Sequence, residues 1–178
     1  MNLYTDVSRL ETCPDVTQMV VDIPLYSTSK FEYDEEKGYF TLDRTLYSPF
    51  YYPFEYGFIP QTKGEDGDAI DVVTLASRPT FPGCVVKVRP VGVLRMSDEE
   101  GVDHKIICVP DGKIDPRFAH VKDISDIEEH IKKEYELFLT DYKKLEPGKY
   151  EQVTVEGFGD RKEACDILTQ GVERYDQQ

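Results

Sequence analysis

Short apolar runs between turn residues dominate the first two thirds of the chain. Each run is rich in Val, Ile or aromatic residues and is bounded by Gly, Pro or Asp, which is the pattern of a β-strand. The predicted strands cover residues 18–23, 31–33, 39–42, 70–75, 85–94 and 105–109, and residues 55–60 have the pattern of a further strand end. This part of the chain therefore predicts a sheet of many short strands.

Helical spacing replaces the strand pattern in the last third of the chain. Ser125 and Glu128 form a capping-box pattern, and apolar residues then recur on one helical face. That face comprises Ile127, Ile131, Tyr135, Phe138, Leu139 and Tyr142. Residues 150–156 return to a strand pattern, and Asp160 with Glu163 predicts the start of a second helix. The apolar face of the second helix comprises Ala164, Leu168, Val172 and Tyr175.

Many short strands followed by two helices predict the α+β class. The simplest arrangement is a small closed β-barrel with the helices packed outside it. The chain has 178 residues, of which 39% are hydrophobic. This length supports one sizeable core and is short for two, so we expect residues 1–178 to form a single domain.

The chain is strongly acidic, with a formal net charge of -14. Such a surface repels nucleic-acid phosphates and anionic lipids, and no block of Lys and Arg offers a local basic patch, so we expect neither nucleic acid nor a membrane as a partner. Residues 1–10 lack the apolar core of a signal peptide, and no apolar run approaches the roughly 20 residues of a membrane helix. The sequence thus predicts a soluble cytoplasmic protein.

The cysteines and histidines do not form metal-binding patterns. No two cysteines have C-x-x-C or other metal-ligand spacing, and the three histidines are equally dispersed, which argues against a His-rich zinc site. We expect reduced, structurally incidental thiols at Cys13, Cys84, Cys108 and Cys165.

Two acidic loops lie at predicted strand ends. Asp66, Asp68 and Asp71 fall within one short turn, where mutual repulsion disfavours three carboxylates unless cations lie among them. The second loop covers residues 97–103 and joins two predicted strands. Oxygen ligands without nearby His or Cys select Mg²⁺, Mn²⁺ or Ca²⁺ over zinc and copper. The two loops could converge on one metal-binding cavity.

Two other interpretations of the acidic loops have to be weighed. An EF-hand does not fit the first loop, because the sixth position counted from Asp66 is Asp71 instead of Gly and the twelfth is Ser77 instead of Glu. A solvated surface turn fits either loop taken alone, because Asp and Gly are common turn residues.

Cationic and tyrosine residues elsewhere in the chain favour a functional site. Lys30 and Glu32 share one short predicted strand, Arg44 follows the next, and Tyr142 with Lys143 ends the first predicted helix. Beside a carboxylate cluster that holds metal ions, Lys, Arg and Tyr side chains can bind and neutralise a polyanionic phosphate substrate.

Several stretches occur in the same order in a known enzyme family. They are residues 55–71 with the motif Asp66-Gly67-Asp68-Ala69-Ile70-Asp71-Val72, the run 89–94 that leads into Asp98 and Glu99, Tyr142 with Lys143, and residues 155–157. On these stretches the chain resembles the soluble family I inorganic pyrophosphatases, from about residue 20 to residue 175.

The resemblance implies a fold, an activity and an assembly. The implied fold is a five-stranded OB-type β-barrel with additional strands and two flanking α-helices. The implied activity is hydrolysis of inorganic pyrophosphate to two orthophosphates, with several Mg²⁺ ions per active site and Mn²⁺ as a substitute. A cytoplasmic location and a homo-oligomer, most often a hexamer, are also implied.

The resemblance further implies roles for individual residues. Asp68 corresponds to the general base. The implied metal ligands are Asp66, Asp71, Asp98 and Asp103, and the implied substrate-binding residues are Lys30, Arg44, Tyr56, Tyr142 and Lys143. The supporting cavity residues are Glu32, Tyr52, Glu99, Lys105 and Asp22. The family usually has Glu in the position of Asp22, so an outer-sphere metal contact there needs a bridging water or a small backbone shift.

Elementary chemistry agrees with direct attack by water. Pyrophosphate carries several negative charges that repel a nucleophile, and two metal ions about 3.5 to 4 Å apart lower the pKa of a shared water toward neutrality. The neighbouring charges of Asp66 and Asp71 raise the pKa of Asp68, which suits a base. We therefore expect a metal-activated water and no phosphoenzyme.

Two functions from other classes compete with pyrophosphate hydrolysis. One is a metal-dependent phosphoesterase or nucleotide hydrolase that uses the same carboxylates on an organic phosphate. The other is an oligonucleotide-binding module, because OB-type barrels often bind nucleic acid through basic, aromatic faces. The net charge of -14 argues against the second.

Overall fold

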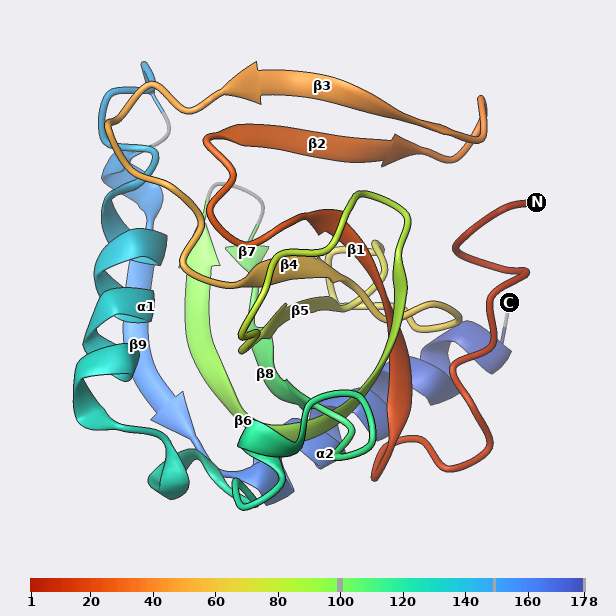
Figure 1. Ribbon diagram of the computed structural model, residues 1–178. Helices are drawn as coiled ribbons and strands as arrows, with labels where there is room; N and C mark the ends of the chain where they lie inside the picture. Colours follow the sequence, from red (N-terminus) through yellow and green to blue (C-terminus); the bar gives the residue numbers. More distant parts are fainter. Residues whose placement is uncertain (99–100, 149, 178) are drawn as a thin grey trace.

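A closed ring of five strands forms the centre of the molecule in the computed structural model, which describes residues 1–98, 101–148 and 150–177 (Figure 1). The ring follows the order β1, β4, β5, β8 and β6, and β6 pairs back with β1 to close it. These strands are β1 (Thr17–Ile23), β4 (Glu55–Phe58), β5 (Asp71–Thr74), β6 (Val85–Asp98) and β8 (Lys105–Pro110). β5 and β8 are parallel, whereas the other neighbours in the ring are antiparallel.

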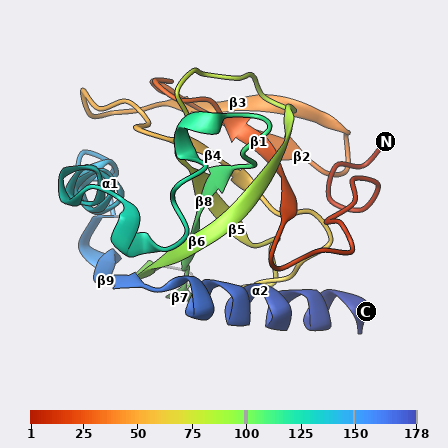
Figure 2. The same cartoon turned by 60° about the horizontal axis from the view of Figure 1, so that its bottom comes forward.

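Further strands and two helices surround the ring. Strands β7 (Gly101–Val102) and β9 (Thr154–Gly159) both pair with β6, and β2 (Ser29–Asp34) with β3 (Tyr39–Thr45) forms a separate hairpin above the ring in Figure 1. Helix α1 (Glu129–Asp141) lies along β9, and α2 (Arg161–Asp176) crosses β6, as the two views show (Figures 1 and 2). Short 3-10 turns cover Pro116–Phe118, Ile124–Asp126 and Tyr150–Gln152. The predicted α+β barrel with outer helices is confirmed.

The long strand β6 connects the ring to the outer elements because it bends. Its pairing register with β8 shifts between Pro90 and Gly92, and a bulge of this kind bends a strand and increases its twist. A Cβ at Gly92 would lie 2.8 Å from the carbonyl oxygen of Gly159 and 2.8 Å from the Cβ of Ile124. Glycine therefore allows β9 to approach β6 closely at this bend.

Gly57 brings β1 and β4 together beside the predicted site. A Cβ at this position would lie 1.9 Å from the carbonyl oxygen of Val20, a distance that no side chain can occupy. Since the neighbouring residue is Tyr56, the close strand contact also fixes the position of that tyrosine.

The first helix begins later than the sequence predicts. In place of the predicted capping box between Ser125 and Glu128, Asp123 and Asp126 form one around a 3-10 turn. The side chain of Asp123 also accepts a hydrogen bond from the backbone N–H of Arg161, at the start of α2, which favours this cap over the predicted one. Helix α1 starts directly after Glu128, whose side chain makes no capping hydrogen bond. The predicted box is therefore wrong.

The predicted strand at residues 150–156 is wrong in its first half. Tyr150–Gln152 forms a 3-10 turn, and β9 continues beyond the prediction to Gly159. Gly157, with a φ of 90°, lies opposite Arg95 of β6. Pairing with β6 extends the strand through two glycines that intrinsic propensity disfavours.

The second helix has the predicted cap and a slightly different buried face. The Asp160 side chain accepts a hydrogen bond of 2.8 Å from the backbone N–H of Glu163, which confirms the predicted start. The buried residues of the helix are Ala164, Leu168 and Gly171. The predicted Val172 and Tyr175 are only partly buried. Gly171 lies at the contact instead, because a Cβ there would lie 2.2 Å from Cδ1 of Ile70, where the helix meets the barrel.

A buried carboxylate fixes two loops around the start of β4. Glu55 is 2% exposed, and its Oε1 accepts hydrogen bonds from the backbone N–H groups of Leu25 at 3.1 Å and Thr80 at 3.0 Å. Its Oε2 accepts a hydrogen bond of 2.6 Å from the hydroxyl of Thr80. Because the next residue is Tyr56, this anchor supports the cavity wall.

Replacing Glu55 by Ala is expected to lower the free energy of unfolding by about 2 to 3 kcal/mol, because the backbone N–H groups of Leu25 and Thr80 lose their acceptor. Urea unfolding of the purified variant measures this loss. Glu55→Gln retains an acceptor oxygen and is expected to lose much less, and the exposed Glu136→Ala serves as the control. Equal stability of the three variants would contradict the anchoring role.

Candidate active site

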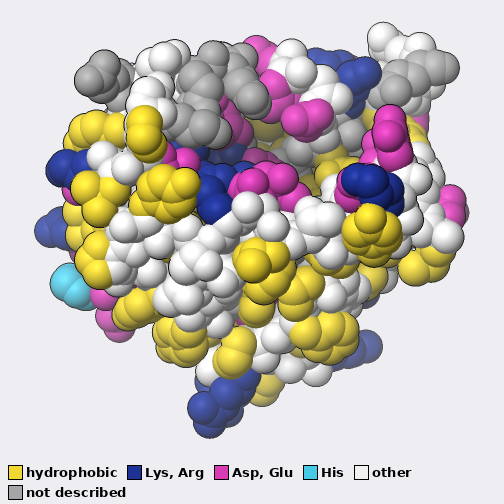
Figure 3. Space-filling view, turned by 90° about the horizontal axis from the view of Figure 1, so that it is seen from above, with side chains coloured by type: hydrophobic (Ala, Val, Ile, Leu, Met, Phe, Trp, Pro, Cys, Tyr) yellow, Lys and Arg dark blue, Asp and Glu magenta, His cyan; other side chains and the backbone are white. Residues whose placement is uncertain are grey.

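A polar cavity of about 540 Å³ contains every predicted site residue that the structure describes. Those residues are Asp22, Lys30, Glu32, Arg44, Tyr52, Tyr56, Asp66, Asp68, Asp71, Asp98, Asp103, Lys105, Tyr142 and Lys143. Glu99 lies outside the described residues. The space-filling view shows acidic side chains beside Lys and Arg side chains on one face of the molecule (Figure 3). The two acidic loops thus converge, although they are far apart in the sequence.

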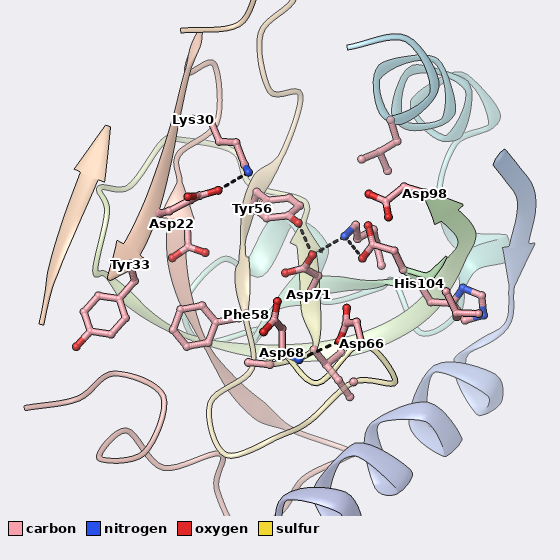
Figure 4. A pocket seen from close by; sticks show the side chains of 18 of the residues that line it. Asp22, Lys30, Tyr33, Tyr56, Phe58, Asp66, Asp68, Asp71, Asp98 and His104 are labelled. Carbon is pink, nitrogen blue, oxygen red and sulfur yellow. Dashed lines mark hydrogen bonds and ion pairs between the residues drawn. The ribbon is translucent and has the colours of Figure 1, made fainter. Parts of the chain in front are cut away.

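The first acidic loop is a tight turn that presents Asp68 to the cavity. Oδ1 of Asp66 accepts a hydrogen bond of 3.0 Å from the backbone N–H of Asp68, and the turn includes Gly67 with a φ of 100°, which L side chains rarely adopt. The carboxylate of Asp68 lies beside those of Asp66 and Asp71 (Figure 4). Burial, followed by these two negative charges, raises the pKa of Asp68 above its ordinary value.

Strand pairing brings Tyr56, Asp71 and Lys105 together. Phe58 of β4 lies opposite Asp71 of β5, so Tyr56, two residues earlier, is a diagonal neighbour on the same face. Strands β5 and β8 pair in parallel, which places their first residues, Asp71 and Lys105, side by side. The Asp71 carboxylate accepts a short hydrogen bond from the Tyr56 hydroxyl (Figure 4) and another from the Lys105 ammonium group.

Lys105 is a buried cation shared by two carboxylates. The residue is 4% exposed, and its ammonium group also donates a short hydrogen bond to Asp103. Burial lowers the pKa of Lys105, but the charges of Asp71 and Asp103 outweigh this effect and the net shift is upward. Burial raises the pKa of Asp103 to about 6, against the opposing charge of Lys105. Lys105 therefore stays charged among the carboxylates.

The end of α1 supplies a second cation, paired with the second acidic loop. Lys143 Nζ lies 2.9 Å from Oδ2 of Asp98, and both side chains are largely buried. The ring of Tyr142 stacks on Phe138 at a centroid distance of 5.0 Å, and Tyr52 packs on the same phenylalanine at 4.8 Å. This aromatic packing fixes the helix end, and with it Lys143, against the barrel.

The β2–β3 hairpin supplies two further cations. Lys30 lies directly opposite Arg44 in the pairing of the two strands. The ammonium group of Lys30 lies 2.5 Å from a carboxylate oxygen of Glu32 and 3.7 Å from one of Asp43. Arg44 forms ion pairs with Asp43 and, at 2.9 Å, with Glu146. Both cations therefore lie in the cavity wall among acidic side chains.

Asp22 is the least satisfied carboxylate of the cavity. Its Oδ1 atom is buried and has no hydrogen-bond partner among the described residues. Burial, together with the charges of Asp71 and Glu32, raises its pKa well above the ordinary value. An orphaned carboxylate oxygen at this depth fits a cavity that receives a cation or a water molecule.

Asp22→Asn is expected to stabilise the protein at neutral pH in metal-free buffer. A carboxyl group whose folded-state pKa is raised contributes most stability below its unfolded pKa of about 4, and loses it as the pH rises toward the folded-state pKa. The gain from Asn should therefore be largest at pH 7 and shrink toward pH 4, as measured by thermal unfolding. Asp34→Asn is the control with the opposite sign, because Lys37 lowers the pKa of Asp34. A destabilised Asp22→Asn variant at pH 7 would contradict this account.

The capacity of the cavity for metal ions rests on oxygen donors. Among the described residues, no three His, Cys, Asp or Glu side chains form a closed metal-binding group. Instead, the Lys105 ammonium group lies between Asp71 and Asp103. Carboxylates that are spread over two loops suit a hydrated divalent cation that is held by one or two of them.

Sequence reasoning did not single out two acidic residues near the cations. Asp43 has no cross-strand partner in the β2–β3 pairing because the register shifts from Lys30 opposite Arg44 to Phe31 opposite Leu42. Glu146 is 7% exposed in the turns after α1, and its partner Arg44 is 102 residues away in the sequence. The adjacency of Asp43 to Arg44 was a usable signal, whereas no local pattern indicates the role of Glu146.

Comparison with known proteins agrees with this geometry. The family profile described as inorganic pyrophosphatase matches residues 19–176. The chain belongs to the inorganic pyrophosphatase family. It is 51% identical over 153 residues to an inorganic pyrophosphatase of Leifsonia xyli, covering 86% of this chain and 91% of the relative. It is 45% identical over 164 residues to that of Sulfolobus acidocaldarius, covering 92% and 94% respectively.

Solved structures of inorganic pyrophosphatases share the fold. The crystal structure of the enzyme from Thermus thermophilus has a TM-score of 0.94 and 42% identity, and the similarity covers 99% of each chain. The predicted membership of this family is therefore confirmed. Within the described part of the chain, none of the helices has the length and apolar character needed to span a lipid bilayer.

Proposed function

We propose that this inorganic pyrophosphatase hydrolyses pyrophosphate to two orthophosphates in the cavity described above. The observation that carries this proposal is the meeting of cations from three separate elements with carboxylates from both acidic loops in one cavity. The cations are Lys30 and Arg44 of the hairpin, Lys105 at the start of β8, and Lys143 after α1. A substrate with two adjacent phosphate groups offers oxygen atoms to several such cations at once.

Mg²⁺ is the metal that we propose for this site, with Mn²⁺ as a substitute. Asp66, Asp71, Asp98 and Asp103 would hold the ions, because they are hard oxygen donors on both sides of the cavity. Bound divalent cations supply positive charge that shields the anionic substrate oxygens and lowers the pKa of the attacking water.

The side chains of the protein account for binding and for proton removal. Lys30, Arg44 and Lys143 would bind substrate oxygens and stabilise the departing phosphate. The hydroxyls of Tyr56 and Tyr142 can donate hydrogen bonds to the same oxygens without adding charge. Burial raises the pKa of both tyrosines, which keeps the hydroxyls protonated. Tyr52 and Glu32 would support the cavity wall.

Asp68 is the residue that we assign as the base. Its carboxylate is exposed to the cavity, and burial with the charges of Asp66 and Asp71 raises its pKa, which makes it a better proton acceptor. Asp66 and Asp71 beside it are engaged in the turn and in the contacts with Tyr56 and Lys105. The proton of the attacking water would pass to Asp68, and water would attack phosphorus directly without a phosphoenzyme.

A homohexamer in the cytoplasm is also part of this proposal. It follows from the resemblance to the family, and exposed aromatic side chains support an association between copies of the chain. Tyr26 and Tyr51 pack edge to face at a centroid distance of 5.7 Å while 62% and 52% exposed. Light scattering of the purified chain measures its mass in solution.

The proposed activity is tested by phosphate release from different substrates. Pyrophosphate, a nucleoside triphosphate and an aryl phosphate are compared with Mg²⁺ and with Mn²⁺. We expect pyrophosphate to be hydrolysed far faster than the other two with Mg²⁺. Faster hydrolysis of the aryl phosphate or the nucleotide would favour a phosphoesterase or nucleotide hydrolase instead.

A further inference from the structure

We propose that Glu146 is a positioning residue for Arg44, which orients the guanidinium group for phosphate binding throughout turnover. This inference rests on the proposed function of the cavity and adds a residue that lies outside its lining. Glu146 does not touch the substrate in this account. It acts through the hydrogen bond that it accepts from Arg44.

The contact between the two residues is long-range, buried and specific in its atoms. Nε of Arg44 donates a hydrogen bond of 2.9 Å to Oε1 of Glu146, across 102 residues of sequence. The two side chains are 16% and 6% exposed. Glu146 is itself fixed, because its backbone N–H donates to the carbonyl oxygen of Lys143 at 2.8 Å. The turn that carries Lys143 therefore also orients Arg44 on the opposite hairpin.

The other two nitrogens of Arg44, Nη1 and Nη2, do not contact Glu146 in the same way as Nε does. Nη1 is paired with Asp43, whose side chain is 30% exposed and also lies 3.7 Å from Lys30. Nη2 is buried and has no hydrogen-bond partner among the described residues. A buried donor without an acceptor is costly, so its persistence indicates a group that is satisfied by a ligand.

A bound phosphate group is therefore expected to displace Asp43 from Arg44 but not Glu146. A phosphate group that displaces the more exposed Asp43 carboxylate would accept hydrogen bonds from both Nη1 and Nη2 of Arg44, in the bidentate geometry typical of arginine. The buried Glu146 carboxylate stays on Nε and fixes the plane of the guanidinium group. Without it, the charge of Arg44 would remain but its orientation would be lost.

A double-mutant cycle tests this coupling. The wild type, Arg44→Ala, Glu146→Ala and the double variant are titrated with methylenediphosphonate and Mg²⁺ by calorimetry, and kcat and KM for pyrophosphate are measured in parallel. We expect Glu146→Ala, which removes the acceptor of the Arg44 Nε hydrogen bond, to weaken diphosphonate binding about tenfold when Arg44 is present and less than about twofold in the Arg44→Ala background. An equal loss in both backgrounds would overturn the proposal.

Two further variants separate positioning from folding. Arg44→Lys keeps the charge but removes the Nε donor, so it is expected to lose about as much affinity as Glu146→Ala, and full affinity would overturn the proposal. Glu163→Ala is the control, because it removes another long-range ion pair, with Arg95 at 2.6 Å, whose two residues do not line the cavity. Its diphosphonate affinity should stay at the wild-type value, and a tenfold loss there would also overturn the proposal.

The two proposals can fail independently, because hydrolysis tests the function and diphosphonate binding tests the positioning role of Glu146. If the wild type does not hydrolyse pyrophosphate, the function is wrong, while the diphosphonate cycle still measures the coupling between Arg44 and Glu146. If the wild type does not bind methylenediphosphonate, the positioning proposal itself is wrong. Thermal unfolding of each variant shows whether a loss of affinity accompanies a loss of structure.

Discussion

Asp71→Ala is expected to lower kcat/KM for pyrophosphate by about 10³-fold, which corresponds to about 4 kcal/mol. The carboxylate lies at the start of β5, between the hydroxyl of Tyr56 and the ammonium group of Lys105. In the proposed site it would also hold Mg²⁺, so its loss should weaken metal binding as well as turnover. No neighbouring carboxylate on β5 can replace it, because the following residues of that strand point into the barrel core or carry no charge.

The metal-binding part of this prediction is measured independently of turnover. Equilibrium dialysis or titration with Mn²⁺ should give a clearly weaker affinity for Asp71→Ala than for the wild type. Asp166→Ala, which removes an aspartate that pairs with Lys162 on the surface of α2, is the matched control and should bind as the wild type does. Unchanged Mn²⁺ affinity in Asp71→Ala would refute its role as a ligand.

Lys105→Met is expected to destabilise the metal-free protein by about 3 to 5 kcal/mol. The side chain of Lys105 is 5% exposed and neutralises both Asp71 and Asp103. A methionine of similar length leaves two carboxylates facing each other without a cation. The pKa of Asp103, already raised to about 6 by burial, should rise further in the variant.

Added Mg²⁺ should restore part of this lost stability, because a divalent cation supplies charge to the same carboxylates. Thermal unfolding with and without Mg²⁺ measures the effect, and Lys162→Met on the exposed face of α2 is the control. A variant that is as stable as the wild type in metal-free buffer would show that Lys105 is not the cation that holds this cluster together.

Local sequence patterns predicted the part of the site that lies within one loop. They did not predict the part that depends on pairing between distant strands. Asp66, Asp68 and Asp71 lie within one turn, so their proximity follows from sequence spacing alone. The position of Lys105 between Asp71 and Asp103 depends instead on the parallel pairing of β5 with β8. The resemblance to the family included Lys105 only as a supporting residue, and the structure makes it the centre of an ion cluster.

The errors in the predicted helices and strands also come from contacts between residues that are distant in the sequence. A capping-box spacing occurs twice between residues 123 and 128, and contact with the distant Arg161 favours the box of Asp123 with Asp126. The strand β9 passes through two glycines because β6 pairs with it. Asp43 faces the cations because of a register shift that no alternation of polar and apolar residues indicates. Tertiary contacts decide each of these cases.

The central claim is that Asp68 accepts the proton of the water that attacks pyrophosphate in this cavity. The most direct measurement compares kcat of Asp68→Asn with that of the wild type at saturating Mg²⁺ and pyrophosphate. Asn keeps the size of the side chain and the exposed position at the turn but cannot serve as a base. The account predicts a kcat at least about 10²-fold lower, with diphosphonate affinity and thermal stability near those of the wild type. A kcat near that of the wild type would contradict it.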